Sequence, residues 1–212
     1  MFLSLKSLSR SIHDDNQEHP ELSETEGGRL CTSLTVWRKS LIVSCKGFTV
    51  IDSNGDLVYR VDSYMGGRTK ELILMDGSGK TIFTMRRRCK NLRLVDTWLV
   101  YAGEVGEFCT SGQPILYVKK SINILHAEPN VLAYVYRRST DKQYAYTIEG
   151  SYSQRSCKVV DETKRVVAEI RPKDALNGCI SFGLEVFVMI VQAGFDPGFA
   201  MGLVLLLDQM FS

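Results

Sequence analysis

The sequence has few residues of the kinds that build metal sites and fibrous repeats. Its 212 residues include 3 histidines, 5 prolines and 17 glycines, which excludes collagen-like and proline-rich repeats. No two of the 6 cysteines are close enough for a Cys-x-x-Cys pair, and the histidines do not stand at zinc-ligand spacing. We therefore expect no metal and no other cofactor.

Motifs of the common enzyme sites are also missing. The sequence has no Gly-x-Ser-x-Gly, no Gly-x-x-x-x-Gly-Lys-Ser/Thr and no Gly-x-Gly-x-x-Gly. Residues 77–80, Gly-Ser-Gly-Lys, are too short for a phosphate-binding loop. His126 is the only histidine beyond the first 33 residues, so a Cys–His pair stays open, but a packed or surface histidine is favoured. The sequence predicts a protein that is not an enzyme.

The first residues contain no sustained apolar run of the kind found in signal peptides. A disulfide framework needs an oxidising compartment, so the cysteines are expected to be reduced thiols. These observations indicate a cytoplasmic protein, with the membrane face and the nucleus as further locations.

Residues 1–33 differ in composition from the rest of the chain. They carry 3 basic and 6 acidic side chains and few large apolar residues after Ile12, which predicts a disordered polar tail. Leu5, Leu8 and Ile12 share helical spacing, which leaves a membrane-surface helix as an alternative. Residues 34–212 form the predicted folded domain.

Most of that domain is predicted to form strands, because short β-branched or aromatic segments alternate with turn residues. Twelve strands and few helical signals favour an antiparallel barrel or sandwich. The predicted strands are 34–43, 48–52, 57–63, 70–75, 80–87, 92–101, 114–119, 131–137, 143–150, 156–161, 165–171 and 184–192.

One hairpin pattern recurs. The segment from Asp52 to Gly55 is repeated from Asp76 to Gly79, and a fainter copy without the glycine begins at Asp161. Aspartate can cap such a turn with its own side chain, and glycine accepts a positive φ. The sequence predicts tight hairpins at these places rather than cation-binding loops.

The end of the sequence, from residue 185 onward, is unusually apolar. Residues 185–191 are apolar on both faces, and residues 197–210 read as a helix that is apolar all round. Asp196 and Pro197 are a helix start signal. The apolar helix is shorter than the about 20 residues of a membrane span. A central helix inside a barrel of about twelve strands therefore explains the pattern better than a membrane anchor, because barrel diameter grows with strand number.

Residues 30–211 resemble the plant LURP-one-related family. The features that carry this resemblance are the strand from Leu34, the hairpins at 48–62 and 74–83, the Leu94–Trp98–Tyr101 spacing and the apolar end. The resemblance implies a twelve-stranded antiparallel barrel around a central apolar C-terminal helix, as in tubby C-terminal domains and phospholipid scramblases. It implies a non-catalytic binding or adaptor module, related to membrane-tethered transcription regulators, that binds phosphoinositides in plant defence signalling. The alternative is a membrane-inserted, scramblase-like protein that moves lipids.

The resemblance does not extend to the calcium segment of scramblases. Only Glu185 and Asp196 are acidic in the corresponding part of this chain. Calcium takes six to eight oxygen ligands, so a calcium site is not expected here.

Basic residues provide the candidate binding site. The densest cluster of basic side chains consists of Arg86, Arg87, Arg88, Lys90 and Arg93. In a strand, Arg86 and Arg88 lie on one face and Arg87 on the other. Arginine forks bind phosphate bidentately. The expected partner is an anionic membrane lipid or a signalling protein, and a solvated barrel rim is the structural alternative. Sequence-specific nucleic acid is not expected, because the charge balance is modest and no recognition helix is predicted. The protein is expected to be a monomer.

Overall fold

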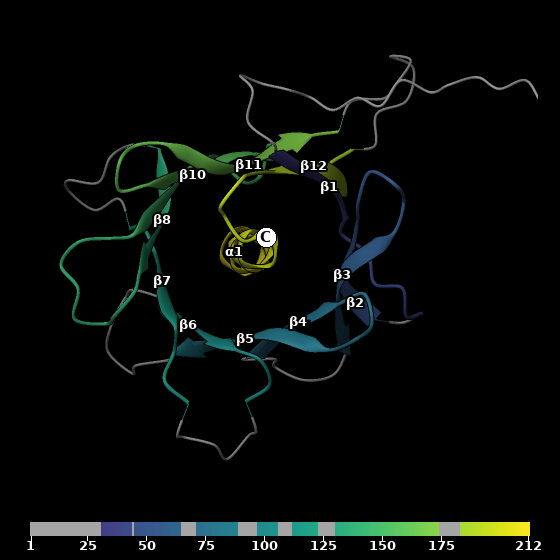
Figure 1. Cartoon of the computed structure of the whole chain (residues 1–212), viewed down its shortest axis with the longest axis horizontal. Helices are drawn as coiled ribbons and strands as arrows, with labels where there is room; N and C mark the ends of the chain where they lie inside the picture. The colour runs from purple at the N-terminus through teal and green to yellow at the C-terminus, as the bar shows by residue number, and fades with distance from the viewer. Residues whose placement is uncertain are drawn as a thin grey trace, which may run out of the picture.

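The chain forms a closed barrel of twelve antiparallel strands around one helix, as the sequence predicts (Figure 1). The computed structural model describes residues 31–43, 45–64, 71–88, 97–105, 112–122, 130–173 and 183–212. The strands are β1 (Cys31–Trp37), β2 (Cys45–Ile51), β3 (Leu57–Tyr64), β4 (Glu71–Asp76), β5 (Thr81–Arg88), β6 (Thr97–Ala102), β7 (Leu116–Lys120), β8 (Val131–Tyr136), β9 (Tyr146–Ser151), β10 (Ser156–Asp161), β11 (Val166–Pro172) and β12 (Val186–Gln192), and the helix is α1 (Pro197–Phe211).

Strands that follow one another in the chain pair with one another, and β1 closes the ring against β12. The closing pair runs in unbroken register from Cys31 opposite Gln192 to Trp37 opposite Val186. The first strand therefore begins three residues earlier than predicted and ends at Trp37. The backbone N–H of Arg38 still donates a hydrogen bond of 2.8 Å to the carbonyl oxygen of Glu185, and the chain then bends toward β2. The predicted tail, apart from residues 31–33, lies outside the described residues.

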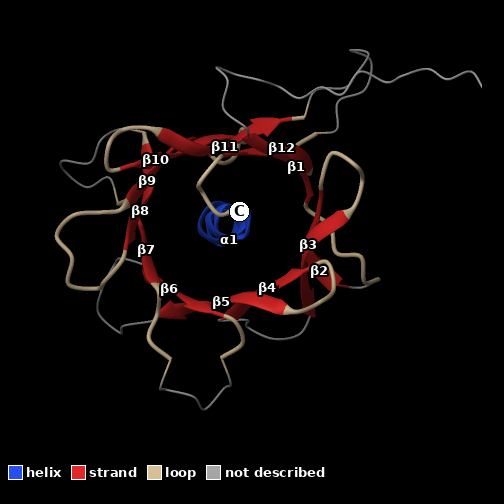
Figure 2. Cartoon of the chain, viewed as in Figure 1, coloured by secondary structure: helices blue, strands red, loops and turns tan. Residues whose placement is uncertain are grey.

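Helix α1 lies along the barrel axis (Figure 2). Asp196 caps its first turn by accepting a hydrogen bond from the backbone N–H of Phe199, and Pro197 stands at the first helical position. Twelve of its fifteen residues are buried. Protein therefore surrounds the helix on every side, which explains why its sequence has no polar face.

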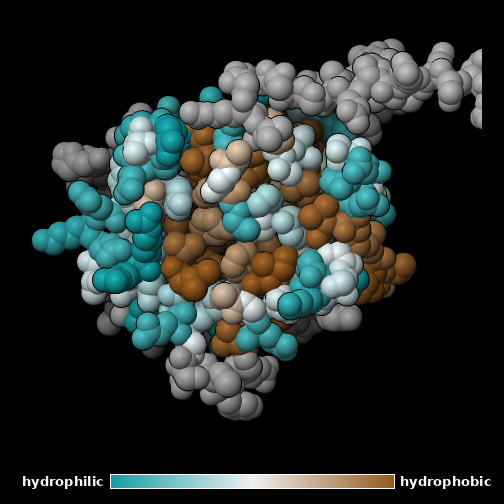
Figure 3. Space-filling model, viewed as in Figure 1, coloured by the Kyte–Doolittle hydropathy of each residue, from teal (hydrophilic) through white to brown (hydrophobic). Residues whose placement is uncertain are grey.

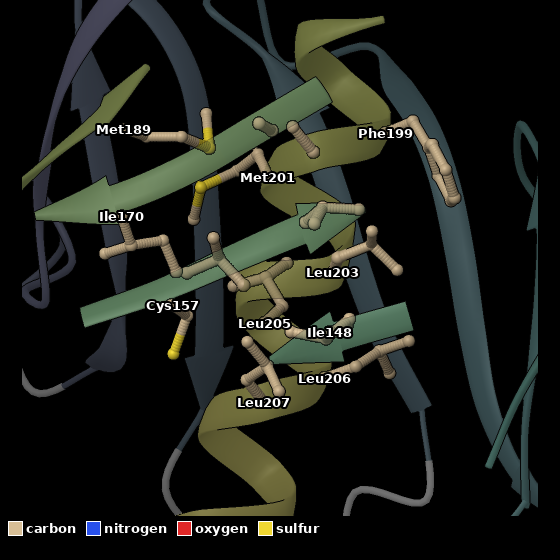
Figure 4. Close-up of a cluster of buried hydrophobic side chains, with 14 of the residues drawn as sticks. Ile148, Cys157, Ile170, Met189, Phe199, Met201, Leu203, Leu205, Leu206 and Leu207 are labelled. Atoms are coloured by element: carbon tan, nitrogen blue, oxygen red, sulfur yellow. The ribbon is translucent and has the colours of Figure 1, made fainter. Parts of the chain in front are cut away.

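The core forms between α1 and the inward side chains of the strands. Leu203, Leu205 and Leu207 are 1% exposed and pack among Ile148, Met189 and other inward residues (Figure 4). Side chains also fill the barrel end that faces the viewer in Figure 3, so the space between the ribbons is not a channel. The part of the chain that the structure describes contains no helix with the length and hydropathy of a membrane span.

Candidate functional site

The arginine segment lies at the end of β5, where the strand leaves the barrel wall. Arg87 stands opposite Trp98 of β6, whose side chain is buried in the core, so Arg87 occupies an inward position at the rim. Arg86 and Arg88 occupy outward positions. The predicted alternation of the three arginines agrees with this register, and Arg87 and Arg88 are exposed.

Arg86 is half-buried because neighbouring groups hold it in place. Its guanidinium pairs with the carboxylate of Glu71, which stands directly opposite on β4. Its Nη2 also donates a hydrogen bond of 2.7 Å to the carbonyl oxygen of Val105. Arg86 is therefore oriented by protein contacts, and Arg87 and Arg88 are more exposed than Arg86. Lys90 and Arg93 lie outside the described residues.

The sequence contains two further basic pairs, Lys119–Lys120 and Arg137–Arg138, and they lie at opposite ends of the barrel. Lys119 and Lys120 end β7, an odd-numbered strand like β5, and so lie at the same barrel end as Arg88. Arg137 and Arg138 follow β8 and lie at the other end. The fold thus places the lysine pair near the arginine segment and separates it from the arginine pair.

Lys120 does not add its charge to the surface. Its Nζ donates a hydrogen bond of 2.5 Å to the carbonyl oxygen of Met210 and lies 4.3 Å from the ring centroid of Phe211. Carbonyl groups at a helix C-terminus lack intrahelical partners and carry partial negative charge. Lys120 therefore stabilises the end of α1.

A buried carboxylate lies at the same end of the helix. Asp208 Oδ1 lies 2.9 Å from Arg38 Nε and accepts hydrogen bonds from the Tyr152 hydroxyl at 3.1 Å and the Ser212 hydroxyl at 2.8 Å. Burial, and then the charge of Asp208, raises the pKa of Tyr152 well above its ordinary value. These contacts join α1 to residues that follow β1 and β9. They satisfy a charge that would otherwise be costly to bury.

The buried thiol of this region is not an activated nucleophile. Cys157 is 2% exposed, and burial raises the pKa of its thiol to about 12, although the charge of Arg155 acts in the opposite direction. A cysteine nucleophile acts as the thiolate. His126, the histidine considered from the sequence, lies outside the described residues.

The acidic residues considered for calcium have structural contacts. Glu185 lies 3.4 Å from Arg38, and Asp196 caps α1. Within the described ranges, no group of three histidine, cysteine or acidic side chains lies close enough to hold a metal ion.

Two neighbouring cavities lie at the other end of the barrel, beside Arg137, one of the basic residues that the sequence offers as an alternative site. One has a volume of about 340 Å³, and its lining includes Arg137, Tyr146, Arg165 and Phe195. The second, of about 440 Å³, shares Arg137 with it. Arg165 is already bound to Asp161, with Nη2 at 2.9 Å from the carboxylate, so the first cavity is mixed in charge rather than basic.

The comparisons with known proteins point to one family. The family model described as LURP-one-related matches residues 32–208. Protein LURP-one-related 17 of Arabidopsis thaliana is 47% identical, with 100% of each chain covered. Protein LURP-one-related 8 of the same plant is 43% identical, with 91% of this chain and 96% of that protein covered.

A solved structure supports the fold independently of the sequence. The X-ray structure of a protein from Arabidopsis thaliana superposes with a TM-score of 0.59, covering 84% of this chain and 90% of that chain at 23% identity. At that identity the likeness concerns the barrel alone.

Proposed function

The chain belongs to the LURP-one-related family, and from that premise we propose that it is a non-catalytic binding or adaptor module whose ligand is an anionic lipid headgroup at the end of β5. Phosphoinositides are the first candidates, and the setting is plant defence signalling. We also propose that the protein is related to the tubby-like, membrane-tethered transcription regulators. In this view the protein is a monomer in the cytoplasm that reaches the membrane face or the nucleus.

The observation that carries the proposal is the exposure of Arg87 and Arg88 at the rim of the barrel. A phosphate group can approach these guanidinium groups without their being buried, so little desolvation opposes binding. Arg86 adds a third cation next to them, partly neutralised by Glu71. Because Arg87 and Arg88 are more exposed than Arg86, we expect them to contribute more.

The lipid-moving alternative needed α1 as its membrane anchor. In the folded chain α1 is enclosed by the barrel and supplies much of the core. Inserting it into a bilayer would require the barrel to open and expose its apolar inner face, which the hydrophobic effect opposes. We therefore favour a binding or adaptor function over lipid movement.

The test replaces the cluster while keeping side-chain length. Arg86→Gln, Arg87→Gln and Arg88→Gln together should weaken binding to phosphoinositide vesicles at low salt by about tenfold or more, because each contact near an anionic surface contributes on the order of 1 kcal/mol. Pelleting with vesicles at two salt concentrations measures this.

The matched control is Arg137→Gln with Arg138→Gln, two exposed arginines at the opposite end of the barrel. It should bind like the unmodified protein. Equal loss in both variants, or binding that does not respond to salt, would refute the proposed site, since a charge-driven contact must weaken as ions screen it.

A further inference from the structure

The charges of the barrel wall are unequally distributed among the strands. Strands β5, β6, β7 and β8 together contain five basic residues and, within their bounds, no acidic residue. The other eight strands carry four basic and six acidic residues. Because β5 to β8 are consecutive in the ring, the strands without acidic residues form one sector, at the lower left of Figure 1. Arg87 and Lys120 occupy inward positions at the rim, which leaves Arg86, Arg88 and Lys119 on the outer face.

Strand register brings two of these cations onto the same outer face. Arg88 stands opposite Thr97, Thr97 opposite Lys119, and Lys119 opposite Tyr134, which forms one row across four strands. Residues paired in this way point to the same side of a sheet, and neighbouring strands lie about 4.8 Å apart. Lys119 therefore belongs with Arg88, although more than thirty positions separate them in the sequence.

The adjacent outer row joins the cations to tyrosines. Arg86 stands opposite Leu99, Leu99 opposite Tyr117, and Tyr117 opposite Tyr136. Lys119 Nζ lies 4.3 Å from the ring centroid of Tyr136, so the two rows contact each other. We call this surface, made of Arg86, Arg88, Tyr117, Lys119, Tyr134 and Tyr136, the basic wall.

From this arrangement we infer that the basic wall is a membrane-docking surface, on which the barrel lies side-on against an anionic bilayer. The inference rests on the proposed function and extends it, because the contact then runs from the rim at Arg88 across the strands to Lys119 and the tyrosines. Tyrosine suits this position because its ring is apolar and its hydroxyl group remains hydrated at the interface.

The spacing of the charges favours a bilayer over a folded partner or nucleic acid. Arg88 and Lys119 are separated by Thr97, so the wall presents dispersed charges on the outer face of the closed ring. Mobile lipid headgroups can gather under each cation separately. A folded protein would have to match the whole surface in shape.

The experiment measures binding to phosphatidylcholine vesicles with and without phosphatidylserine. Lys119→Gln should weaken binding to the anionic vesicles about fivefold, and Lys119→Gln with Arg88→Gln roughly 25-fold, at on the order of 1 kcal/mol per cation. Lys158→Gln is the matched control, since Lys158 is an exposed strand lysine that faces Glu149 and Glu169 on the neighbouring strands. It should bind like the unmodified protein.

The tyrosines are tested separately. Tyr117→Ala should weaken vesicle binding severalfold while Tyr117→Phe retains it, because the ring supplies the apolar contact. Thermal unfolding of each variant shows whether the barrel is intact, and Lys119→Gln stays informative if Tyr117→Ala does not fold.

The outcomes separate this inference from the proposed function. If the unmodified protein ignores every anionic vesicle, both are wrong. If it binds, and the β5 arginines matter while Lys119 and Tyr117 do not, the rim site stands and the basic wall is refuted. Equal losses for Lys119→Gln and Lys158→Gln would indicate attraction by overall charge and also refute it. Retention on single-stranded RNA with the same residue dependence, and no vesicle binding, would assign the wall to nucleic acid and overturn it.

Discussion

Three aspartates close three hairpins by the same set of contacts. In each turn the aspartate carboxylate accepts a backbone hydrogen bond from the residue four positions later, at 2.9 Å for Asp52, 2.9 Å for Asp76 and 3.0 Å for Asp161. Gly55 and Gly79 take φ values of 88° and 91° at the turn, and Lys164 takes 64° at the matching place. The sequence predicted the first two hairpins well because glycine accepts this conformation.

The third hairpin is harder to predict because Lys164 occupies the glycine position. A side chain in the left-handed region is strained, so the turn must be held by other contacts. Asp161 supplies them, since it also accepts hydrogen bonds from Thr163 and pairs with Arg165. Only Asp161 marks this turn in the sequence.

We predict that Asp161 stabilises the fold at neutral pH and that acid removes this contribution. Its hydrogen bonds with the Thr163 hydroxyl and the Arg165 backbone hold the pKa of its carboxyl well below the usual range. The folded state thus favours the charged carboxylate, and this stabilisation is complete above the unfolded pKa of about 4 and lost as the pH falls toward the folded pKa. Asp161→Asn should therefore be less stable than the unmodified protein at neutral pH, with the gap shrinking below about pH 4.

Urea unfolding at a series of pH values measures this difference. A gap that stays constant down to strongly acidic pH would contradict a role for the charge of Asp161. It would indicate instead that the amide fails to reproduce the hydrogen-bond geometry.

At the scale of the elements, helix α1 decides whether the barrel has a core. The sequence left two environments open for an all-apolar helix, and helix length favoured a protein interior over a membrane. The structure confirms that choice. Strand boundaries were less predictable: the segment predicted as 34–43 ends at Trp37, because pairing with β12 rather than local composition fixes its extent.

We predict that a charge in the middle of α1 prevents folding. Leu205 is 1% exposed and packs inside the ring, so Leu205→Asp would bury a carboxylate without a partner, at a cost of several kcal/mol. The variant should be insoluble or lack a cooperative thermal transition. Leu205→Met is the control, because it preserves volume and should cost less than about 1.5 kcal/mol.

A chain that ends at Phe195 tests the same element by removing it. Without α1, the inward side chains of the strands would face an empty interior, so soluble monomeric folding should be lost. A monomeric protein of this length that unfolds cooperatively would show that the barrel does not need its helix.

At the scale of the whole molecule, the ring is complete from Cys31 onward. From Cys31 onward, strand β1 pairs with β12 along its whole length and with β2 from Thr35 to Trp37. We therefore expect deletion of residues 1–30 to change the thermal midpoint by no more than a few degrees. Differential scanning calorimetry of the two chains measures this, and a larger drop would mean that the deleted segment packs on the barrel.

The candidate site extends across several strands, and only some of its residues could be predicted from the sequence. The run of Arg86, Arg87 and Arg88 is a local pattern, so it was found directly. Its relation to Lys119 depends on the register of β5, β6 and β7, which distant pairing determines. The predicted strands from 80 to 137 contain six basic residues and one acidic residue, Asp96, and this imbalance was a usable signal had the charges been compared strand by strand.

Because the barrel closes through β1 and β12, it cannot finish folding until both strands have been synthesised. Cys31 cannot meet Gln192 until everything between them has been made, which takes roughly 10 to 30 seconds at ribosomal elongation rates. During that interval the growing sheet has open edges and an apolar face, and α1, which follows all twelve strands, does not yet cover it. Such surfaces aggregate readily, so the nascent chain should need a chaperone to hold it until the helix emerges.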